Sequence, residues 1–241
     1  MQRLKRWFGA KRETGIGASI VTLTGWGQPH DALRVIAPGA LHFDFAPLSG
    51  IDAIGETLVR EAPAPDLLIG WSLGGQLAAR LVAKGAIRPK RLLLIAPSYQ
   101  YLAGERFPDG MKQDLFEKFY ENYKRSPERT IDKSWALVAK GDARAEQVSA
   151  QLMQHRARVD YTHWLRWLDE LAAFSCDALD FSGFPPATLL HGAGDVVSQP
   201  AQSHAYMRRL PCAALHLLQQ AGHAPHLHDI DHALGHIAAA A

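Results

Sequence analysis

The chain has 241 residues, 47% of them hydrophobic and 21% charged, and a formal net charge of +2. These values are typical of one large globular domain and exclude a general nucleic-acid-binding protein. Two cysteines, Cys176 and Cys212, are too few for a disulfide framework, so we expect both thiols to be free and buried in a reducing compartment. No apolar run approaches the roughly 20 residues that cross a bilayer, so we expect a cytoplasmic monomer with no membrane partner.

The N-terminal residues 1–12 are basic and lack the apolar core of a signal peptide. We interpret them as a solvated arm, with binding to a membrane surface or an acidic partner as the alternative. Beyond them, residues 19–24 are β-branched and apolar and predict a central strand, and residues 33–37 predict a second strand. Residues 51–61 place apolar side chains on one face of a helix.

The stretch around Ser72 combines a strand, a sharp turn and a helix. Residues 67–69 predict a buried strand, and residues 73–84 predict a helix. The pentapeptide Gly70–Gly74 between them matches G-x-S-x-G, the pattern of a nucleophile elbow. Its glycines let strand and helix approach closely, and the helix N-terminus offers N–H groups to a developing oxyanion. The pattern predicts Ser72 as a nucleophile and the Leu73 N–H as an oxyanion donor.

A second oxyanion donor is expected in the loop after the first strand. That loop reads Gly25-Trp26-Gly27. Proteins with a nucleophile elbow take their second donor from a loop of this kind. We therefore expect the backbone N–H of Trp26 to contribute, with simple packing of the Trp26 ring as the alternative.

Residues 98–180 have a different character, because helical periodicity dominates and aromatic residues gather there. They predict four helices and no strand: 112–125, 127–140, 143–158 and 161–174. We interpret this segment as a helical cap inserted over the site, with one or two of its aromatics lining an acyl pocket. The core is then residues 1–97 and 181–241, an α/β fold whose mostly parallel sheet is flanked by helices.

Strand patterns lie on both sides of the cap, and a helix closes the chain: strands at 91–96, 187–191 and 215–218, and the helix at 229–240. Asp195 and His223 follow the last two strands. The carboxyl ends of parallel strands meet at one sheet edge, where ligands bind. A serine hydroxyl needs a base, the base needs an orienting acid, and the chain order Ser, Asp, His is typical of this chemistry. We predict that Ser72, Asp195 and His223 form a catalytic triad.

Other titratable groups compete with this assignment. Asp177 and Asp180 are the alternative acids, and His191, within its strand, is expected in the core or near the surface. Three histidines share one face of the last helix with a spacing that could bind a metal: His228, His232 and His236. No carboxylate or cysteine framework surrounds them, so we expect a solvated face, no metal and no organic cofactor. A non-catalytic scaffold is the alternative from another class, and the intact triad argues against it.

With these residues in hand, the sequence resembles the α/β-hydrolase superfamily from about residue 19 onward. More closely, it resembles the pimeloyl-[acyl-carrier protein] methyl ester esterase family of biotin synthesis. The matching stretches are Gly25-Trp-Gly27, Gly70-Trp-Ser-Leu-Gly-Gly75, Ala96-Pro-Ser98, Phe107-Pro-Asp-Gly110, Glu128-Arg-Thr130 and Gly222-His-Ala-Pro225. The resemblance implies that Ser72 attacks a methyl ester at the end of a pimeloyl chain, that methanol leaves, and that acyl-carrier protein is the partner.

The resemblance also implies roles for residues of the cap. Basic positions that match the family's contacts with the acidic carrier are Arg129, Lys133 and, less securely, Arg144, with a solvated basic face as the alternative. The residues implied at the acyl chain are Trp71, Ser134, Trp135, Leu137 and Val138.

The chain departs from the family pattern at three places. Thr24 stands where the family has histidine, so its hydroxyl replaces a structural hydrogen bond or the loop sits differently. The short interval between Trp26 and Ser72 implies that a strand or loop near 37–50 is trimmed. Lys133 replaces an arginine and cannot make the same forked contact. A broader carboxylesterase or thioesterase that acts on short acyl esters is therefore the alternative function.

Overall fold

The computed structural model describes residues 19–239, so the basic arm predicted at 1–12 lies outside the described residues. Its centre is a six-stranded sheet of order β2-β1-β3-β4-β5-β6, in which every neighbouring pair is parallel. The strands are β1 (Ile20–Leu23), β2 (Leu41–His42), β3 (Leu67–Trp71), β4 (Arg91–Ile95), β5 (Ala187–Gly192) and β6 (Ala213–Leu218).

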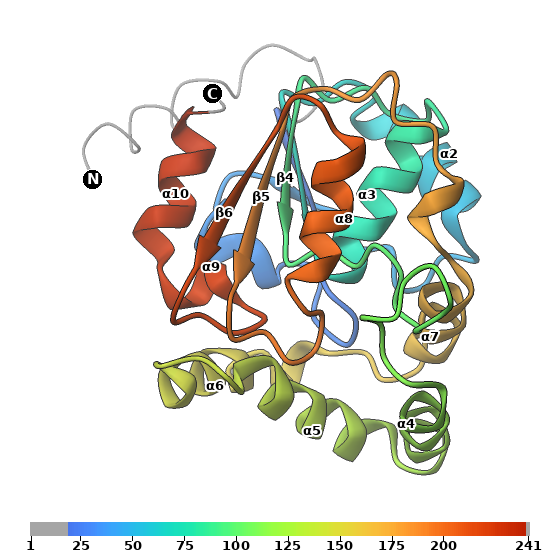
Figure 1. Cartoon of the computed structure of the whole chain (residues 1–241), viewed down its shortest axis with the longest axis vertical. Coiled ribbons are helices and arrows are strands. Elements are labelled where there is room, and N and C mark those ends of the chain that lie inside the picture. The colour runs from blue at the N-terminus through green and yellow to red at the C-terminus, as the bar shows by residue number, and fades with distance from the viewer. Residues whose placement is uncertain (1–18, 240–241) are drawn as a thin grey trace.

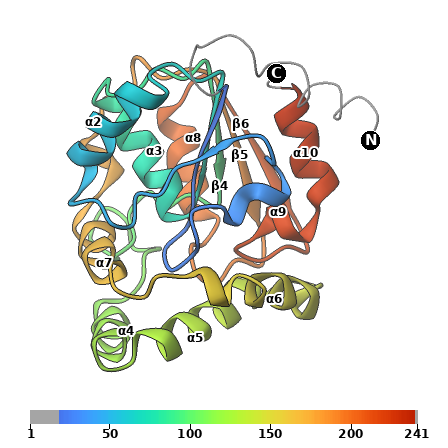
Figure 2. The ribbon, with the colours of Figure 1, turned by 180° about the vertical axis from the view of Figure 1, so that it is seen from behind.

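Helices cover both faces of this sheet (Figures 1 and 2). On one face lie α2 (Ile51–Glu61), α3 (Leu73–Ala83) and α8 (Ala201–Arg209). On the other face lies α10 (Ile230–Ala239), preceded by the short α9 (Pro225–His228). Because both faces are covered, β1 and β3 are buried along their whole length, as apolar runs in a parallel sheet require. The predicted α/β fold with a mostly parallel sheet is confirmed.

The residues between β4 and β5 form helices at one end of the sheet. These are α4 (Gln113–Arg125), α5 (Pro127–Ala139), α6 (Ala145–Met153) and α7 (Trp164–Ala173), with single turns η2 (Arg156–Arg158) and η3 (Cys176–Ala178). They lie across the end toward which the strand arrows point (Figures 1 and 2). No strand occurs within 98–180, which we call the cap segment. Its status as a separate domain stays a prediction.

The strand predicted at 33–37 is wrong. Residues Ala32–Val35 form a single 3-10 turn, η1, in which Ala32 N–H donates to Pro29 C=O at 3.0 Å and Arg34 N–H donates to Asp31 C=O at 2.9 Å. Leu33 and Ile36 are fully buried. The apolar run therefore packs as a helical turn, and the two-residue β2 forms the sheet edge in its place.

The two cysteines differ in their surroundings. Cys176 is free and buried, and burial raises the pKa of its thiol to about 12. Cys212 is free but exposed, so the prediction that both are buried is wrong for Cys212. Across residues 19–239, no helix is long and apolar enough to cross a membrane.

Candidate active site

The turn between β3 and α3 holds Ser72 in a strained conformation. Ser72 has φ +55° and ψ −117°, a region that costs a non-glycine residue on the order of 1–3 kcal/mol. The turn requires glycine on both sides of Ser72: a Cβ on Gly70 of β3 would lie 2.5 Å from the carbonyl oxygen of Gly74 in α3, and a Cβ on Gly74 would lie 2.1 Å from the carbonyl oxygen of Leu23 in β1. The geometry is that of the predicted elbow, and it presents the Ser72 hydroxyl at the carboxyl end of the sheet.

The structure brings Ser72, His223 and Asp195 together. His223 Nε2 lies 2.9 Å from Ser72 Oγ, and His223 Nδ1 lies 2.7 Å from Asp195 Oδ2. Ser72 follows β3, Asp195 follows β5 and His223 follows β6, and both Asp195 and His223 are buried. The alternative acids lie elsewhere: Asp177 accepts from the Tyr99 hydroxyl, and Asp180 accepts from Ser182. The arrangement leaves His223 Nε2 facing the serine hydroxyl, as a general base requires.

Four donors converge on the carboxylate of Asp195. Its Oδ1 accepts from the backbone N–H groups of Val197 at 2.8 Å and Ser198 at 2.9 Å. Its Oδ2 faces His223 Nδ1 and also His191 Nε2 at 3.1 Å. Burial opposes ionisation, but interactions with His223 and His191 outweigh it and hold the pKa of Asp195 well below its ordinary value. Asp195 is therefore a permanently charged acceptor near neutral pH.

His191 is a contact of the site that the sequence assigned only to the core or near the surface. It is fully buried at the end of β5, and its Nδ1 faces the Ser203 hydroxyl at 2.7 Å. Its Nε2 lies near Asp195 and also 2.7 Å from the carbonyl oxygen of Ser198. The spacing of four residues between His191 and Asp195, across the end of a strand, was the available signal.

The cap segment anchors the loop that carries His223. The His223 N–H donates to the carbonyl oxygen of Val138 at 3.1 Å, and the neighbouring Gly222 N–H donates to Asp142 Oδ2 at 2.9 Å. The other oxygen of Asp142 lies 2.7 Å from His228 Nδ1. Asp142 is buried, and no local pattern in the sequence singled it out.

The predicted oxyanion donors are free to bind a ligand. The backbone N–H groups of Trp26 and Leu73 donate no hydrogen bond within residues 19–239. The Trp26 ring also packs: its Nε1 donates to the carbonyl oxygen of Trp164 at 2.8 Å, and its face meets Phe119 and Tyr123 edge-on. Packing of the ring thus fixes the loop while the backbone N–H stays available.

A largely apolar pocket opens at Ser72. Its lining comes from the core loops and the cap segment: Gly25, Trp26, Gln28, Trp71, Ser72, Tyr101, Met111, Phe119, Ser134, Leu137, Val138, Leu168, Leu171, Val196, Val197 and His223. Four of the predicted acyl-chain contacts are among them: Trp71, Ser134, Leu137 and Val138. Trp135 is not among the lining residues: its ring is fully buried, and its Nε1 donates to the carbonyl oxygen of Gly27 at 3.2 Å.

Gln28 gives this pocket an unusual polar group. Its side chain is buried, and neither its oxygen nor its nitrogen has a hydrogen-bond partner within residues 19–239. An unpaired buried amide costs on the order of 1–3 kcal/mol. The buried hydroxyl of Thr24, in the same loop, also has no hydrogen-bond partner within residues 19–239. It therefore does not replace the structural hydrogen bond expected of the family's histidine.

Replacing Gln28 by leucine is expected to raise the unfolding temperature. Leucine has about the same volume as glutamine and lacks its two unpaired polar atoms. The same change is expected to raise KM for an ester substrate several-fold, because the amide is a polar group free to bind it. Thermal unfolding and steady-state kinetics check both results. A lower unfolding temperature would contradict the assignment of Gln28 as unpaired.

A second hollow borders the first and is cationic. It contains Arg125, Arg129 and Lys133, and it shares Phe119, Ser134 and Leu137 with the apolar pocket. Neither Arg129 nor Lys133 has an acidic partner among the described residues. We call this hollow the basic groove.

The structure places Arg144, the third predicted basic contact, outside the basic groove. Arg144 stands at the start of α6, and its Nη1 donates to the carbonyl oxygen of His228 at 2.6 Å. The prediction of Arg144 as a carrier contact therefore has no support from its position.

Comparison with known proteins identifies the family of the chain. The model of the alpha/beta hydrolase family matches residues 5–232. A pimeloyl-[acyl-carrier protein] methyl ester esterase from Aromatoleum aromaticum is 28% identical, over 86% of this chain and 92% of that protein. One from Chromobacterium violaceum is 27% identical, over 88% of this chain and 90% of that protein.

Solved structures share the fold at lower identity. An esterase from Exiguobacterium antarcticum aligns with a TM-score of 0.77 at 14% identity, covering 94% of this chain and 92% of its own. An enol-lactonase from Burkholderia xenovorans aligns with a TM-score of 0.74 at 15% identity, covering 95% of this chain and 93% of its own. The elbow at Ser72, the parallel sheet and the match over residues 5–232 lead to one conclusion: the chain belongs to the alpha/beta hydrolase family.

Proposed function

We propose that this protein is a cytoplasmic serine carboxylesterase that hydrolyses the methyl ester of pimeloyl-acyl-carrier protein, releasing methanol. The observation that carries the proposal is the continuity of two hollows. Ser72 Oγ, 2.9 Å from His223 Nε2, faces an apolar pocket, and that pocket borders the basic groove. An apolar chain attached to an acidic carrier requires both features. Relatives named for this reaction, at 27–28% identity over most of the chain, support the choice of substrate.

The reaction follows from the geometry in two steps. His223 Nε2 takes the proton of Ser72 as Oγ attacks the ester carbonyl, and the Trp26 and Leu73 N–H groups stabilise the oxyanion. Asp195 holds the tautomer of His223 and stabilises the imidazolium. His223 then returns the proton to the methoxide, and methanol leaves an acyl enzyme. Water then attacks the acyl carbonyl as the same imidazole takes its proton. His223 returns that proton to Ser72 Oγ as the acyl–oxygen bond breaks, and the free carboxylic acid leaves.

Carrier recognition is assigned to the basic groove. Arg129 and Lys133 are four residues apart on α5 and project into one hollow together with Arg125. Cations without an internal partner are available to pair with the carboxylates of an acidic protein. Ion pairs between two proteins act mainly on their association rate. The carrier would meet the cap segment there while its acyl chain enters the pocket between the cap helices and Ser72.

The substrate is tested by mass spectrometry. Purified protein is incubated with pimeloyl-acyl-carrier protein methyl ester, and the expected result is the loss of one CH2 from the acyl mass. Rapid cleavage of a short p-nitrophenyl ester without turnover of the carrier-linked ester would retain the esterase mechanism and reject the carrier-linked substrate. That outcome favours the alternative, a broad carboxylesterase or thioesterase on short acyl esters.

Replacing Arg129 and Lys133 together by glutamate is expected to lower kcat/KM for the carrier-linked ester by roughly 10–100-fold at low salt, because like charges repel the acidic carrier. The rate on a p-nitrophenyl ester should stay unchanged. The matched control carries the same change of four charge units outside the basic groove, Arg60→Glu with Arg208→Glu at exposed positions of α2 and α8. Equal loss in this control, or no loss in the double variant, would reject the docking surface.

A further inference from the structure

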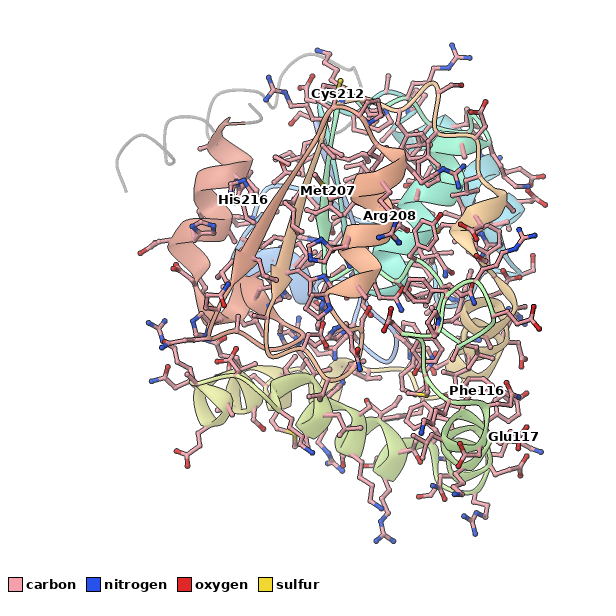
Figure 3. All side chains as sticks on the ribbon, in the orientation of Figure 1. Phe116, Glu117, Met207, Arg208, Cys212 and His216 are labelled. Carbon is pink, nitrogen blue, oxygen red and sulfur yellow. The ribbon has the colours of Figure 1, made fainter. Side chains whose placement is uncertain are left out.

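Three histidine side chains from two separate elements meet beside the edge strand of the sheet. They are His216 on β6 and His232 and His236 on α10, and their ligand nitrogens all lie within 4.8 Å of one another. Figure 3 shows His216 beside β6 on the side of α10. The sequence predicts His232 and His236 on a solvated helix face with His228. The structure instead turns His228 toward Asp142 and supplies His216 as the third ring.

The spacing of the nitrogens is close to that of metal ligands. His232 Nε2 and His236 Nε2 face each other at 3.1 Å. Two nitrogens bound tetrahedrally to one Zn²⁺ at about 2.0–2.1 Å lie roughly 3.3 Å apart. The His216 ring lies against the His236 ring, with a centroid separation of 4.2 Å. Small side-chain rotations therefore suffice to direct three lone pairs at one point.

The three rings of the cluster pack against one another. Within residues 19–239 no carboxylate forms an ion pair with any of the three rings. Neutral imidazoles with free lone pairs are what borderline divalent cations bind.

We propose that His216, His232 and His236 form a three-histidine site for a borderline divalent cation such as Zn²⁺, with its remaining position open to water. The ion would join α10 to β6, the edge strand of the sheet. No residue of this site lines the pocket at Ser72. The ion is therefore expected to stabilise the fold without taking part in ester hydrolysis, and the proposal stands independently of the proposed substrate.

The test uses the full chain, freed of any polyhistidine tag and treated with a chelator. Titration with ZnCl₂ in a calorimeter is expected to show one ion per chain. At a hundredfold excess over Kd, Zn²⁺ should raise the unfolding temperature by roughly 5 °C, and MgCl₂ should not. Activity on a p-nitrophenyl ester should be equal with and without the ion.

Single alanine variants at His232 and His216 are expected to weaken binding at least tenfold and to reduce the thermal shift by half or more at the same Zn²⁺ concentration. His204→Ala, an exposed histidine on α8, is the matched control and should bind like the original chain. Because His232 is exposed, its variant is expected to fold normally. Unchanged binding by His232→Ala, or equal loss by His204→Ala, would overturn the site.

Discussion

Replacing Ser72 by alanine is expected to lower kcat for ester hydrolysis by roughly 10⁵–10⁶-fold. The residual rate is that produced by substrate binding and the oxyanion donors without a nucleophile. The reason for the loss is that, among residues 19–239, Ser72 Oγ is the hydroxyl that His223 Nε2 faces, at 2.9 Å. KM should change little, because the apolar lining and the oxyanion N–H groups remain. Release of p-nitrophenol and mass analysis of the carrier-linked ester measure the loss.

The same variant is expected to keep its fold, since alanine loses only the hydroxyl of a strained residue. Ser182→Ala removes a hydroxyl on the surface and serves as the control, with an unchanged rate expected. Substantial activity in Ser72→Ala would refute the elbow serine as nucleophile and, with it, the serine-esterase mechanism.

Replacing Asp195 by asparagine is expected to lower kcat by roughly 10⁴-fold. The amide oxygen can keep the hydrogen bonds from Val197 and Ser198, which bind Oδ1. The amide NH₂ then faces His223 Nδ1 and His191 Nε2, which in the unchanged protein both face the acceptor Oδ2 of Asp195. To avoid two opposed donors, His223 must move its proton to Nε2, and it can no longer accept the proton of Ser72.

Asp180→Asn provides the matched control, because Asp180 is the acid that the structure separates from the site. It should retain full activity. NMR of the His223 ring protons would distinguish the tautomers directly. An Asp195→Asn enzyme with near-normal kcat would show that another group orients His223.

The site was predictable where local pattern and chain order act together. G-x-S-x-G lies between a strand pattern and a helix pattern, so one short window defines the Ser72 turn. Asp195 and His223 each follow a strand, and a parallel sheet places all strand ends at one edge. These features require no knowledge of packing.

Other features depend on contacts between distant segments, which leave no periodic signal. The apolar run at 33–37 fits a strand or a buried turn equally well, and tertiary packing determines that it forms a turn. On α5, only the position of the neighbouring elements determines that Leu137 faces the pocket and Trp135 faces the loop at Gly27. The pairs Asp142–Gly222 and His191–Asp195 likewise form only once the sheet and the cap segment meet.

The turn between α5 and α6 limits how caps can be recombined among related enzymes. Gly141 has φ +84°, and a Cβ there would lie 2.0 Å from the carbonyl oxygen of Gly194, next to Asp195. The His223 N–H donates to the Val138 carbonyl oxygen and the Gly222 N–H donates to the Asp142 carboxylate, so these bonds and the Gly141 contact form one seam between the cap segment and the catalytic loops. A chimera that exchanges α4 or α7 would vary the acyl pocket and leave the seam whole. A chimera cut within 138–142 would misplace the base and be inactive on every ester.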